Sequence, residues 1–160
     1  MKKLCIKTNL SSYSLEELNE SDRALILEAK EMTKKSYSPY SHFQVGAAAL
    51  LADGTIVKGS NQENAAYPSG LCAERTTLFA ANANYPDQPV KALAIACFTG
   101  GHFTEEPGAP CGSCRQVMLE TEHRFGQPMR VLLYGEKAIY VFDKAEDLLP
   151  YGFFSEDLEG

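Results

Sequence analysis

The 160-residue sequence has no long apolar run and no excess of basic residues. No stretch approaches the roughly 18 apolar residues that a membrane-spanning helix requires, so we expect no membrane anchor. Fifteen Lys and Arg stand against 21 Asp and Glu, which gives a formal net charge of −6, and the basic residues form no cluster. Because a polynucleotide substrate normally recruits a basic patch, this balance favours a small, neutral ligand over a nucleic acid.

The sequence also shows no apolar N-terminal segment with a signal-cleavage site and no low-complexity region. Five cysteines in a chain without such a segment favour a reducing compartment, so we expect a cytosolic protein with free thiols. The length fits a single domain, residues 1–160, that can bury a substantial core without disulfides. We expect Cys5 to be a tail residue and Cys97 to be a buried strand residue.

The other three cysteines lie in two short stretches that begin at Gly70 and Pro110: Cys72, Cys111 and Cys114. Gly70 and Pro110 interrupt the preceding chain and good helix formers follow, so each stretch predicts the start of a helix. At a helix start the dipole and the unpaired N–H groups favour a thiolate over a thiol. The two stretches therefore offer soft, negatively charged ligands for a metal ion such as Zn²⁺.

The spacing of these residues indicates a catalytic rather than a structural zinc site. Cys111 and Cys114 are three residues apart and share a face of the first helical turn. Cys72 and Glu74 are two apart, so they converge only if Cys72 lies at or just outside the helix start with non-helical dihedrals. The stretches contain no fourth ligand, and zinc with three protein ligands keeps one position for water. The three histidines of the chain fall outside both stretches and receive no role.

The sequences CAER, from Cys72, and PCGSCRQ, from Pro110, resemble the zinc signature of the cytidine deaminases, in the three-cysteine form of the small nucleoside enzymes. Residues 38–54, 59–70 and 147–153 also look like that family, so the resemblance covers roughly residues 24–153. It implies one Zn²⁺ per subunit and hydrolytic deamination of cytidine and 2′-deoxycytidine to the uridine nucleosides and ammonia, in pyrimidine salvage. Residues 1–20 form an N-terminal extension without a counterpart in the shortest relatives.

Glu74 and Arg75 are the expected partners of the metal ligands. Glu74 would take a proton from zinc-bound water, pass it to ring nitrogen 3 and then help to protonate the departing ammonia. Zinc lowers the pKa of bound water from about 15.7 to roughly 7, and three thiolates weaken that effect. Arg75 would offset this by a hydrogen bond to a cysteine sulfur, a role to which the resemblance also points.

Asn61 and Glu63 are two residues apart in a predicted strand, so their side chains share a face and could bind a pair of sugar hydroxyls. The matching residues of nucleoside deaminases contact the ribose. The resemblance further implies that Phe43 stacks on the base, that Ala65 offers its backbone to it, and that Phe153 completes a neighbour's pocket in a homotetramer with shared active sites. Two aromatic residues match family positions near the subunit contact: Tyr40 and Tyr67. Packing in the core is the alternative role for five of these residues: Phe43, Ala65, Phe153, Tyr40 and Tyr67.

Hydrophobic periodicity predicts five strands: residues 43–51, 55–64, 90–98, 129–134 and 138–143. A helix capped by Ser21 or Asp22 should run to Lys35, and Asp53-Gly54 should form a hairpin turn. Residues 99–109 read as a glycine-rich loop, residues 4–9 as a short edge strand, and Ser14 with Glu17 as a capping box. The prediction is an α/β layered domain with a mixed sheet of about five strands, and the resemblance implies the three-layer α/β/α sandwich of the cytidine deaminases.

Two alternatives to cytidine deamination remain open. Within the same fold, the substrate could be another aminated heterocycle, such as a nucleoside antibiotic. Gln62 and Ala66 stand where the family more often has small apolar and hydroxyl residues, a departure that concerns the substrate contacts and leaves the metal site unaffected. From a different class, a zinc-stabilised binding protein would have a closed metal shell and a dispensable Glu74.

Overall fold

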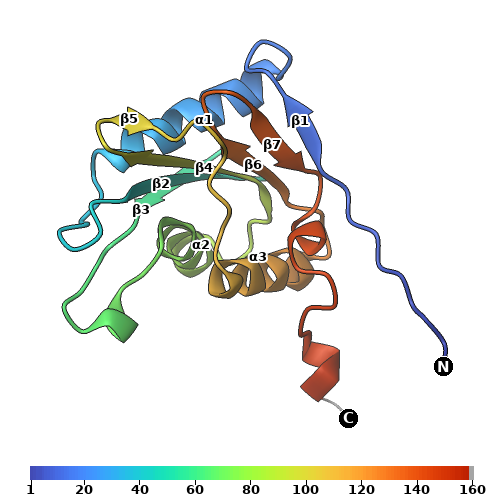
Figure 1. Ribbon diagram of the computed structural model, residues 1–160. Coiled ribbons are helices and arrows are strands. Elements are labelled where there is room, and N and C mark those ends of the chain that lie inside the picture. Colours follow the sequence, from blue (N-terminus) through green and yellow to red (C-terminus); the bar gives the residue numbers. More distant parts are fainter. Residues whose placement is uncertain (159–160) are drawn as a thin grey trace.

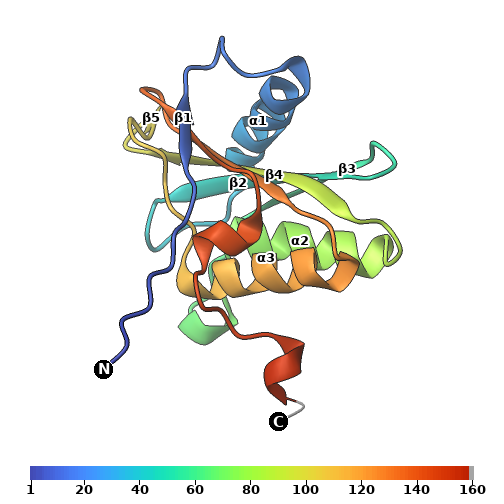
Figure 2. The same cartoon turned by 90° about the vertical axis from the view of Figure 1, so that its right-hand side faces the viewer.

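The computed structural model describes residues 1–158, in which a mixed β-sheet separates two layers of helix (Figures 1 and 2). Helices α2 and α3 lie side by side on one face of the sheet and α1 covers the other. The described strands are β1 (Ser11–Tyr13), β2 (Gln44–Leu51), β3 (Ile56–Ser60), β4 (Val90–Thr99), β5 (His102–Phe103), β6 (Arg130–Tyr134) and β7 (Ile139–Phe142). The helices are α1 (Glu20–Thr33), α2 (Ala73–Asn84) and α3 (Gly112–Phe125). This is the predicted three-layer α/β/α sandwich.

The strand order is β1-β7-β6-β4-β2-β3, with β5 paired to β4. β2 and β3 form the predicted antiparallel hairpin, whose turn contains Gly54 with a positive φ of 91°. β4 pairs antiparallel with β2 and parallel with β6, and α3 lies in the connection between β4 and β6. β6 and β7 pair antiparallel, as their short connection predicts.

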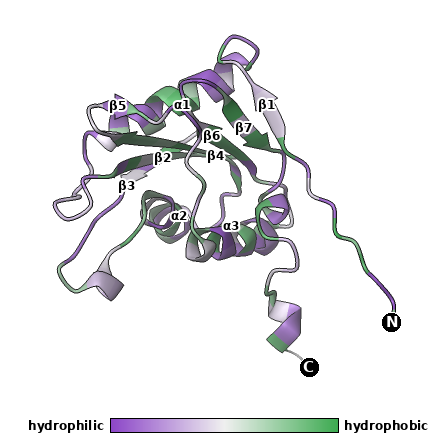
Figure 3. Ribbon diagram, in the orientation of Figure 1, coloured by the Kyte–Doolittle hydropathy of each residue, from purple (hydrophilic) through white to green (hydrophobic). Residues whose placement is uncertain are grey.

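The core lies on both faces of the central strand β4, as its continuous apolar run predicts. Leu93 and Ile95 pack toward α2 and α3, whereas Ala94 and Ala96 pack toward α1. Colouring by hydropathy shows the apolar residues concentrated in the sheet between the two helical layers (Figure 3). Within residues 1–158, no helix combines the length and the apolar character that crossing a membrane requires.

The described sheet has seven strands rather than about five, because two short strands were not predicted. Residues 4–9, expected to form an edge strand, form none; β1 follows them and pairs with the free edge of β7. The glycine-rich loop predicted for residues 99–109 contains β5, because Gly100 and Gly101, both with positive φ, turn the chain back onto the end of β4. Both additions are short and depend on a partner strand, so they leave little periodicity in the sequence.

Helix α1 begins two or three residues earlier than predicted from a cap at Ser21 or Asp22, and it ends two residues earlier. Asn19 is its N-cap: its side chain accepts a hydrogen bond from the Asp22 N–H at 2.8 Å. Ser21 and Asp22 therefore lie inside the helix, which ends at Thr33 instead of Lys35. Upstream, the Ser14 N–H donates to the Glu17 carboxylate as in a capping box, but residues 15–17 form a turn.

Candidate metal centre and substrate cavity

The first turns of α2 and α3 bring three sulfur atoms together. Cys72 is the N-cap of α2, with φ −70° and ψ 156°, and Cys111 is the N-cap of α3, with φ −67° and ψ 167°. The Sγ atoms of Cys72 and Cys111 are 3.9 Å apart, and those of Cys111 and Cys114 are 3.4 Å apart. The extended backbone expected for Cys72 is thus present, and it turns the side chain across the end of its helix.

The donor set fits Zn²⁺. The three sulfur atoms all lie within 4.8 Å of one another, and within residues 1–158 no fourth Cys, His or carboxylate joins the cluster. The pKa of Cys72 is lowered to about 5 by its hydrogen bond with Cys114, with further help from Arg75. The same contact and burial raise the pKa of Cys114 above its usual value. After Cys72, the other thiols of the cluster therefore lose their protons readily only when a cation lies beside them. This is the chemistry of a zinc-thiolate site.

Arg75 lies in the first turn of α2 beside the sulfur atom of Cys72. One guanidinium nitrogen of Arg75 is 3.9 Å from Cys72 Sγ, so the hydrogen bond expected from the sequence is present. Its Nε is buried and has no hydrogen-bond partner among the described residues. The guanidinium thus adds positive charge next to the thiolates.

Glu74 occupies the first turn of α2 and is only 4% exposed. Burial raises the pKa of its carboxyl group above the usual value, and the nearby Cys72 adds to the rise. Its Oε2 atom has no hydrogen-bond partner among the described residues. Buried carboxylate oxygens are normally paired with a hydrogen-bond donor. The unpaired Oε2 therefore indicates a carboxyl group that exchanges a proton with a ligand.

Glu74 lines a cavity of about 440 Å³ together with Cys72 and Cys111, and this size suits a small molecule. Its walls include Phe43, Asn61, Cys72, Glu74, Cys97 and Cys111. A second cavity, of about 500 Å³, lies at the far end of α3 beside His123 and Glu156. None of the described buried side chains that lack a hydrogen-bond partner lines that second cavity, whereas Glu74 lines the first. The first cavity is therefore the candidate substrate site.

Asn61 and Glu63 lie just beyond β3, which ends at Ser60 rather than continuing to Asn64 as predicted. The chain leaves the sheet there because Gln62 forms isolated bridges to Tyr37 and Leu71 instead of continuing the β2 ladder. Both side chains nevertheless face the same segment, residues 40–43.

The Asn61 amide is almost fully used within the chain. Its Oδ1 accepts from the Val45 N–H at 2.8 Å and from the Ser36 hydroxyl, and its Nδ2 donates to the Phe43 carbonyl at 2.8 Å. An amide nitrogen has two donors, so one N–H stays free for a ligand hydroxyl.

The Glu63 carboxylate holds the same segment from the other side. One of its oxygens accepts from the backbone N–H groups of Tyr40 at 2.9 Å and Ser41 at 3.3 Å, and the other accepts from the Ser41 hydroxyl. These bonds, led by that from the Ser41 hydroxyl, lower the pKa of Glu63 below its usual value. A carboxylate has about four acceptor positions, so one stays open.

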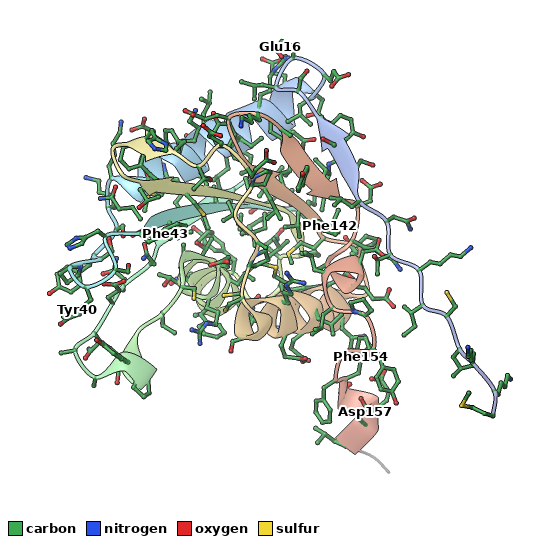
Figure 4. All side chains as sticks on the ribbon, viewed as in Figure 1. Glu16, Tyr40, Phe43, Phe142, Phe154 and Asp157 are labelled. Atoms are coloured by element: carbon green, nitrogen blue, oxygen red, sulfur yellow. The ribbon has the colours of Figure 1, made fainter. Side chains whose placement is uncertain are left out.

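The aromatic residues expected around the base are only partly assembled. Phe43 lines the cavity, and Tyr40 lies on the loop that precedes β2 (Figure 4). Tyr40 packs edge-on against Tyr67 with ring centroids 6.1 Å apart, and both rings are exposed. Ala65 and Phe153 are exposed and, among the described residues, line no part of this cavity. Exposure argues against the core-packing alternative for Tyr40, Tyr67 and Phe153.

Sequence reasoning missed several residues of the cavity wall, of which Ser41, Cys97 and Gly108 have specific contacts. Ser41 lies on the wall and binds Glu63. Cys97 is buried, as predicted, but it also faces the cavity, and burial together with the nearby Glu74 raises the pKa of its thiol to about 12. A Cβ atom at Gly108 would lie 2.6 Å from Cys97 Sγ, so only glycine fits there without a shift. The only sequence signal for Gly108 is its place just before the Pro110-Cys111 stretch.

Comparison with known proteins agrees with this site. A family model described as the cytidine and deoxycytidylate deaminase zinc-binding region matches residues 19–125. The cytidine deaminase of Halalkalibacterium halodurans is 40% identical over 134 residues, which are 84% of this chain and 95% of that protein. The cytidine deaminase of Sporosarcina psychrophila is 42% identical and aligns over 84% of this chain and 92% of its own length.

Solved structures show the same fold. The crystal structure of cytidine deaminase from Burkholderia pseudomallei superposes with a TM-score of 0.70 at 42% identity and covers 85% of this chain and 100% of its own. That of the Mycobacterium tuberculosis enzyme superposes with a TM-score of 0.66 at 32% identity and covers 85% of this chain and 99% of its own.

Proposed function

Because the chain belongs to the cytidine deaminase family, we propose that it hydrolyses cytidine and 2′-deoxycytidine to uridine and 2′-deoxyuridine, with release of ammonia. One observation carries the proposal: a buried glutamate with an unpartnered oxygen shares a cavity with two of the three clustered cysteines. Cys72, Cys111 and Cys114 would hold one Zn²⁺ per subunit. Bound zinc supplies the Lewis acidity that brings the pKa of water from about 15.7 to roughly 7.

Glu74 is the proposed proton carrier. Burial raises the pKa of its carboxyl group in the direction of neutral pH. A group with such a pKa can both accept and return a proton. Oε2 would take a proton from the attacking water, deliver it to ring nitrogen 3, and then assist protonation of the leaving ammonia. Arg75 would hold Cys72 in place and balance the negative charge of the thiolates.

Five further residues, of which Phe43 and Asn61 lie in the cavity wall, would bind the nucleoside. Asn61 has one free N–H and Glu63 one free acceptor position, which match the donor and acceptor characters of two sugar hydroxyls. Phe43 would stack on the base. Ala65 would offer its backbone, and Phe153 would complete the pocket of a neighbouring subunit, which is consistent with the exposure of both residues in the single chain.

We further infer a homotetramer with shared active sites that works in cytosolic pyrimidine salvage and binds neither nucleic acid nor membranes. The net charge of −6 and a cavity of nucleoside size support a free nucleoside as substrate. The chain would form a single domain, residues 1–160, with residues 1–20 as an extension. Light scattering of the purified protein tests the assembly, and a dimer or monomer would contradict it.

The decisive experiment measures zinc content and cytidine turnover on one purified sample. We expect about one zinc per subunit and ammonia release from cytidine and 2′-deoxycytidine, but none from single-stranded polynucleotide. Turnover of another aminated heterocycle with cytidine untouched would favour the heterocycle alternative. Bound zinc without any turnover would favour the zinc-stabilised binding protein.

A further inference from the structure

His42 has an unusual backbone conformation next to the cavity. Its φ is 55°, in the left-handed region that residues other than glycine rarely adopt. Only one other described non-glycine residue, Tyr151, has a positive φ. His42 directly precedes Phe43, the aromatic residue on the cavity wall. Such conformations cluster at functional sites, where the surrounding structure holds them in place.

Hydrogen bonds hold the chain on both sides of this turn. Before it, the His42 N–H donates to the Ser38 carbonyl at 3.0 Å, and Glu63 holds the backbone of Tyr40 and Ser41. After it, the His42 carbonyl accepts from the Thr99 hydroxyl at 3.5 Å.

Phe43 itself is held at both of its peptide groups. Its N–H donates to Ser41 Oγ at 3.1 Å, and its carbonyl accepts from Asn61 Nδ2 at 2.8 Å. The segment is fixed before and after residue 42. The left-handed φ at that position therefore sets the direction of the chain into Phe43, and with it the position of the Phe43 side chain. The His42 imidazole, in contrast, is exposed and makes no hydrogen bond with the described residues.

We propose that His42 is a positioning residue for the nucleoside: its left-handed backbone turn sets the Phe43 ring in the cavity wall. The proposal rests on the proposed function, because it assigns Phe43 to the bound base. His, Asn and Asp tolerate the left-handed region better than other L-residues, and β-branched residues tolerate it least. The backbone at residue 42, rather than the imidazole, is therefore what the site requires.

Three substitutions at one position separate backbone from side chain. His42→Gly and His42→Asn keep the left-handed turn accessible and remove the imidazole. His42→Val disfavours the turn by an amount that corresponds to roughly a tenfold drop in the population of the binding-competent loop. The apparent affinity for the substrate falls by the same factor, because only the competent fraction binds.

The experiment measures kcat and KM for cytidine, the dissociation constant of uridine by calorimetry, zinc content and melting temperature for each variant. For His42→Val we expect both KM and the uridine dissociation constant to rise about tenfold, with kcat and zinc content unchanged within about twofold. His42→Gly and His42→Asn should stay within about threefold of the wild type.

Gly126→Val is the matched control for backbone strain. Gly126 has φ 59° and ψ 28°, and a Cβ there would meet no atom within 4 Å. It caps the opposite end of α3 from Cys111, about 20 Å away at 1.5 Å per residue. This variant should melt at a lower temperature but keep the wild-type KM and uridine affinity.

The outcomes distinguish this proposal from the function on which it rests. If the wild-type protein neither deaminates cytidine nor binds uridine, the proposed function falls and the role of His42 falls with it. If the wild type is active but the Gly variant loses affinity as the Val variant does, the imidazole is responsible and the backbone proposal is wrong. If all three variants bind like the wild type, or if only their melting temperatures change, the turn is merely structural.

Discussion

The side-chain amide of Asn61 donates a hydrogen bond to the backbone carbonyl of Phe43, with 2.8 Å between the two atoms. A residue proposed to bind the sugar therefore also holds the residue proposed to stack on the base. Glu63 does the same through Ser41, whose hydroxyl donates to Glu63 and accepts from the Phe43 N–H. The sugar and base subsites thus share one hydrogen-bonded unit, and changes to one should be felt in the other.

Asn61→Ala should weaken binding of cytidine more than binding of free cytosine, while both become weaker. The nucleoside loses a sugar contact, and both ligands lose the support of Phe43. The substitution also leaves the part-buried Val45 N–H unpaired, so we expect a loss of about 1–3 kcal/mol in the free energy of unfolding. Inhibition constants of cytosine and Michaelis constants of cytidine measure the effect, with Asn84→Ala, an exposed residue at the end of α2, as control. Equal losses for both ligands would contradict a sugar contact by Asn61.

Glu74→Gln should retain zinc and fold but lose nearly all cytidine turnover, because the amide has the same shape and cannot carry a proton. Proton transfer by a positioned group contributes about 10²- to 10⁴-fold, so we expect a loss of kcat of at least that size. Zinc content, the far-ultraviolet circular dichroism spectrum and ammonia release are measured on the same sample. Glu120→Gln, an exposed acid on α3, should change none of them. Unchanged turnover in the Glu74 variant would contradict the assignment of Glu74 as the proton carrier.

The geometry of the metal centre could be predicted from the sequence to a greater extent than that of the substrate cavity. Cys72 and Glu74 are two residues apart, and that spacing alone requires an extended N-cap, which is observed at ψ 156°. In contrast, the contacts of Asn61 reach back to Phe43 and Ser36, and the pairing of β1 with β7 joins the two ends of the chain. Such long-range contacts depend on how the layers pack, and short-range periodicity does not encode them.

The N-cap of α1 illustrates the same limit on a smaller scale. Asn19, Ser21 and Asp22 are all good capping residues, so propensity alone does not decide between them. The observed choice, Asn19, leaves Asp22 free to pair with Arg130 of β6 at 3.2 Å. A contact between distant parts of the chain thus accompanies the observed cap, and the local sequence does not contain that contact.

Replacing cysteines one at a time should separate the metal ligands from the thiol on the cavity wall. Cys114→Ala removes one of the three clustered sulfur atoms, so zinc content should fall well below one per subunit. Cys97→Ala should retain full zinc content, because Cys97 is not part of the cluster, and should lower the free energy of unfolding by about 1 kcal/mol through a small cavity. Elemental analysis after exhaustive dialysis decides between them. Zinc loss in the Cys97 variant would add a ligand that the structure does not place there.

Gly108→Ala should destabilise the protein, because the new Cβ would lie 2.6 Å from Cys97 Sγ. Overpacking of this kind costs about 1–3 kcal/mol in the free energy of unfolding. The double variant with Cys97→Ala removes the clashing sulfur and should recover most of that loss. Denaturant unfolding of the wild type, both single variants and the double variant gives the coupling energy directly. Additive effects would mean that the loop at residue 108 shifts away from β4 instead of pressing on it.

Ser41→Ala should raise the pKa of Glu63 toward its usual value, because the Ser41 hydroxyl is the largest cause of its lowering. A carboxyl group whose pKa is lowered by folding stabilises the folded state above its usual pKa, and that contribution is lost as the pH falls through the lowered value. In the variant, the Glu63 contacts to the backbone of residues 40 and 41 should therefore loosen at a higher pH than in the wild type. Titration of the Glu63 carboxyl carbon by nuclear magnetic resonance measures the shift.

Glu105 is an internal reference in the same titration, because Lys137 lowers its pKa and Ser41 plays no part. A Glu63 resonance that titrates identically in both proteins would show that the backbone N–H groups of Tyr40 and Ser41 hold the carboxylate without the hydroxyl. The position of Phe43 would then depend on Asn61 and on the turn at His42, since the Ser41 hydroxyl would no longer connect Glu63 to the Phe43 N–H.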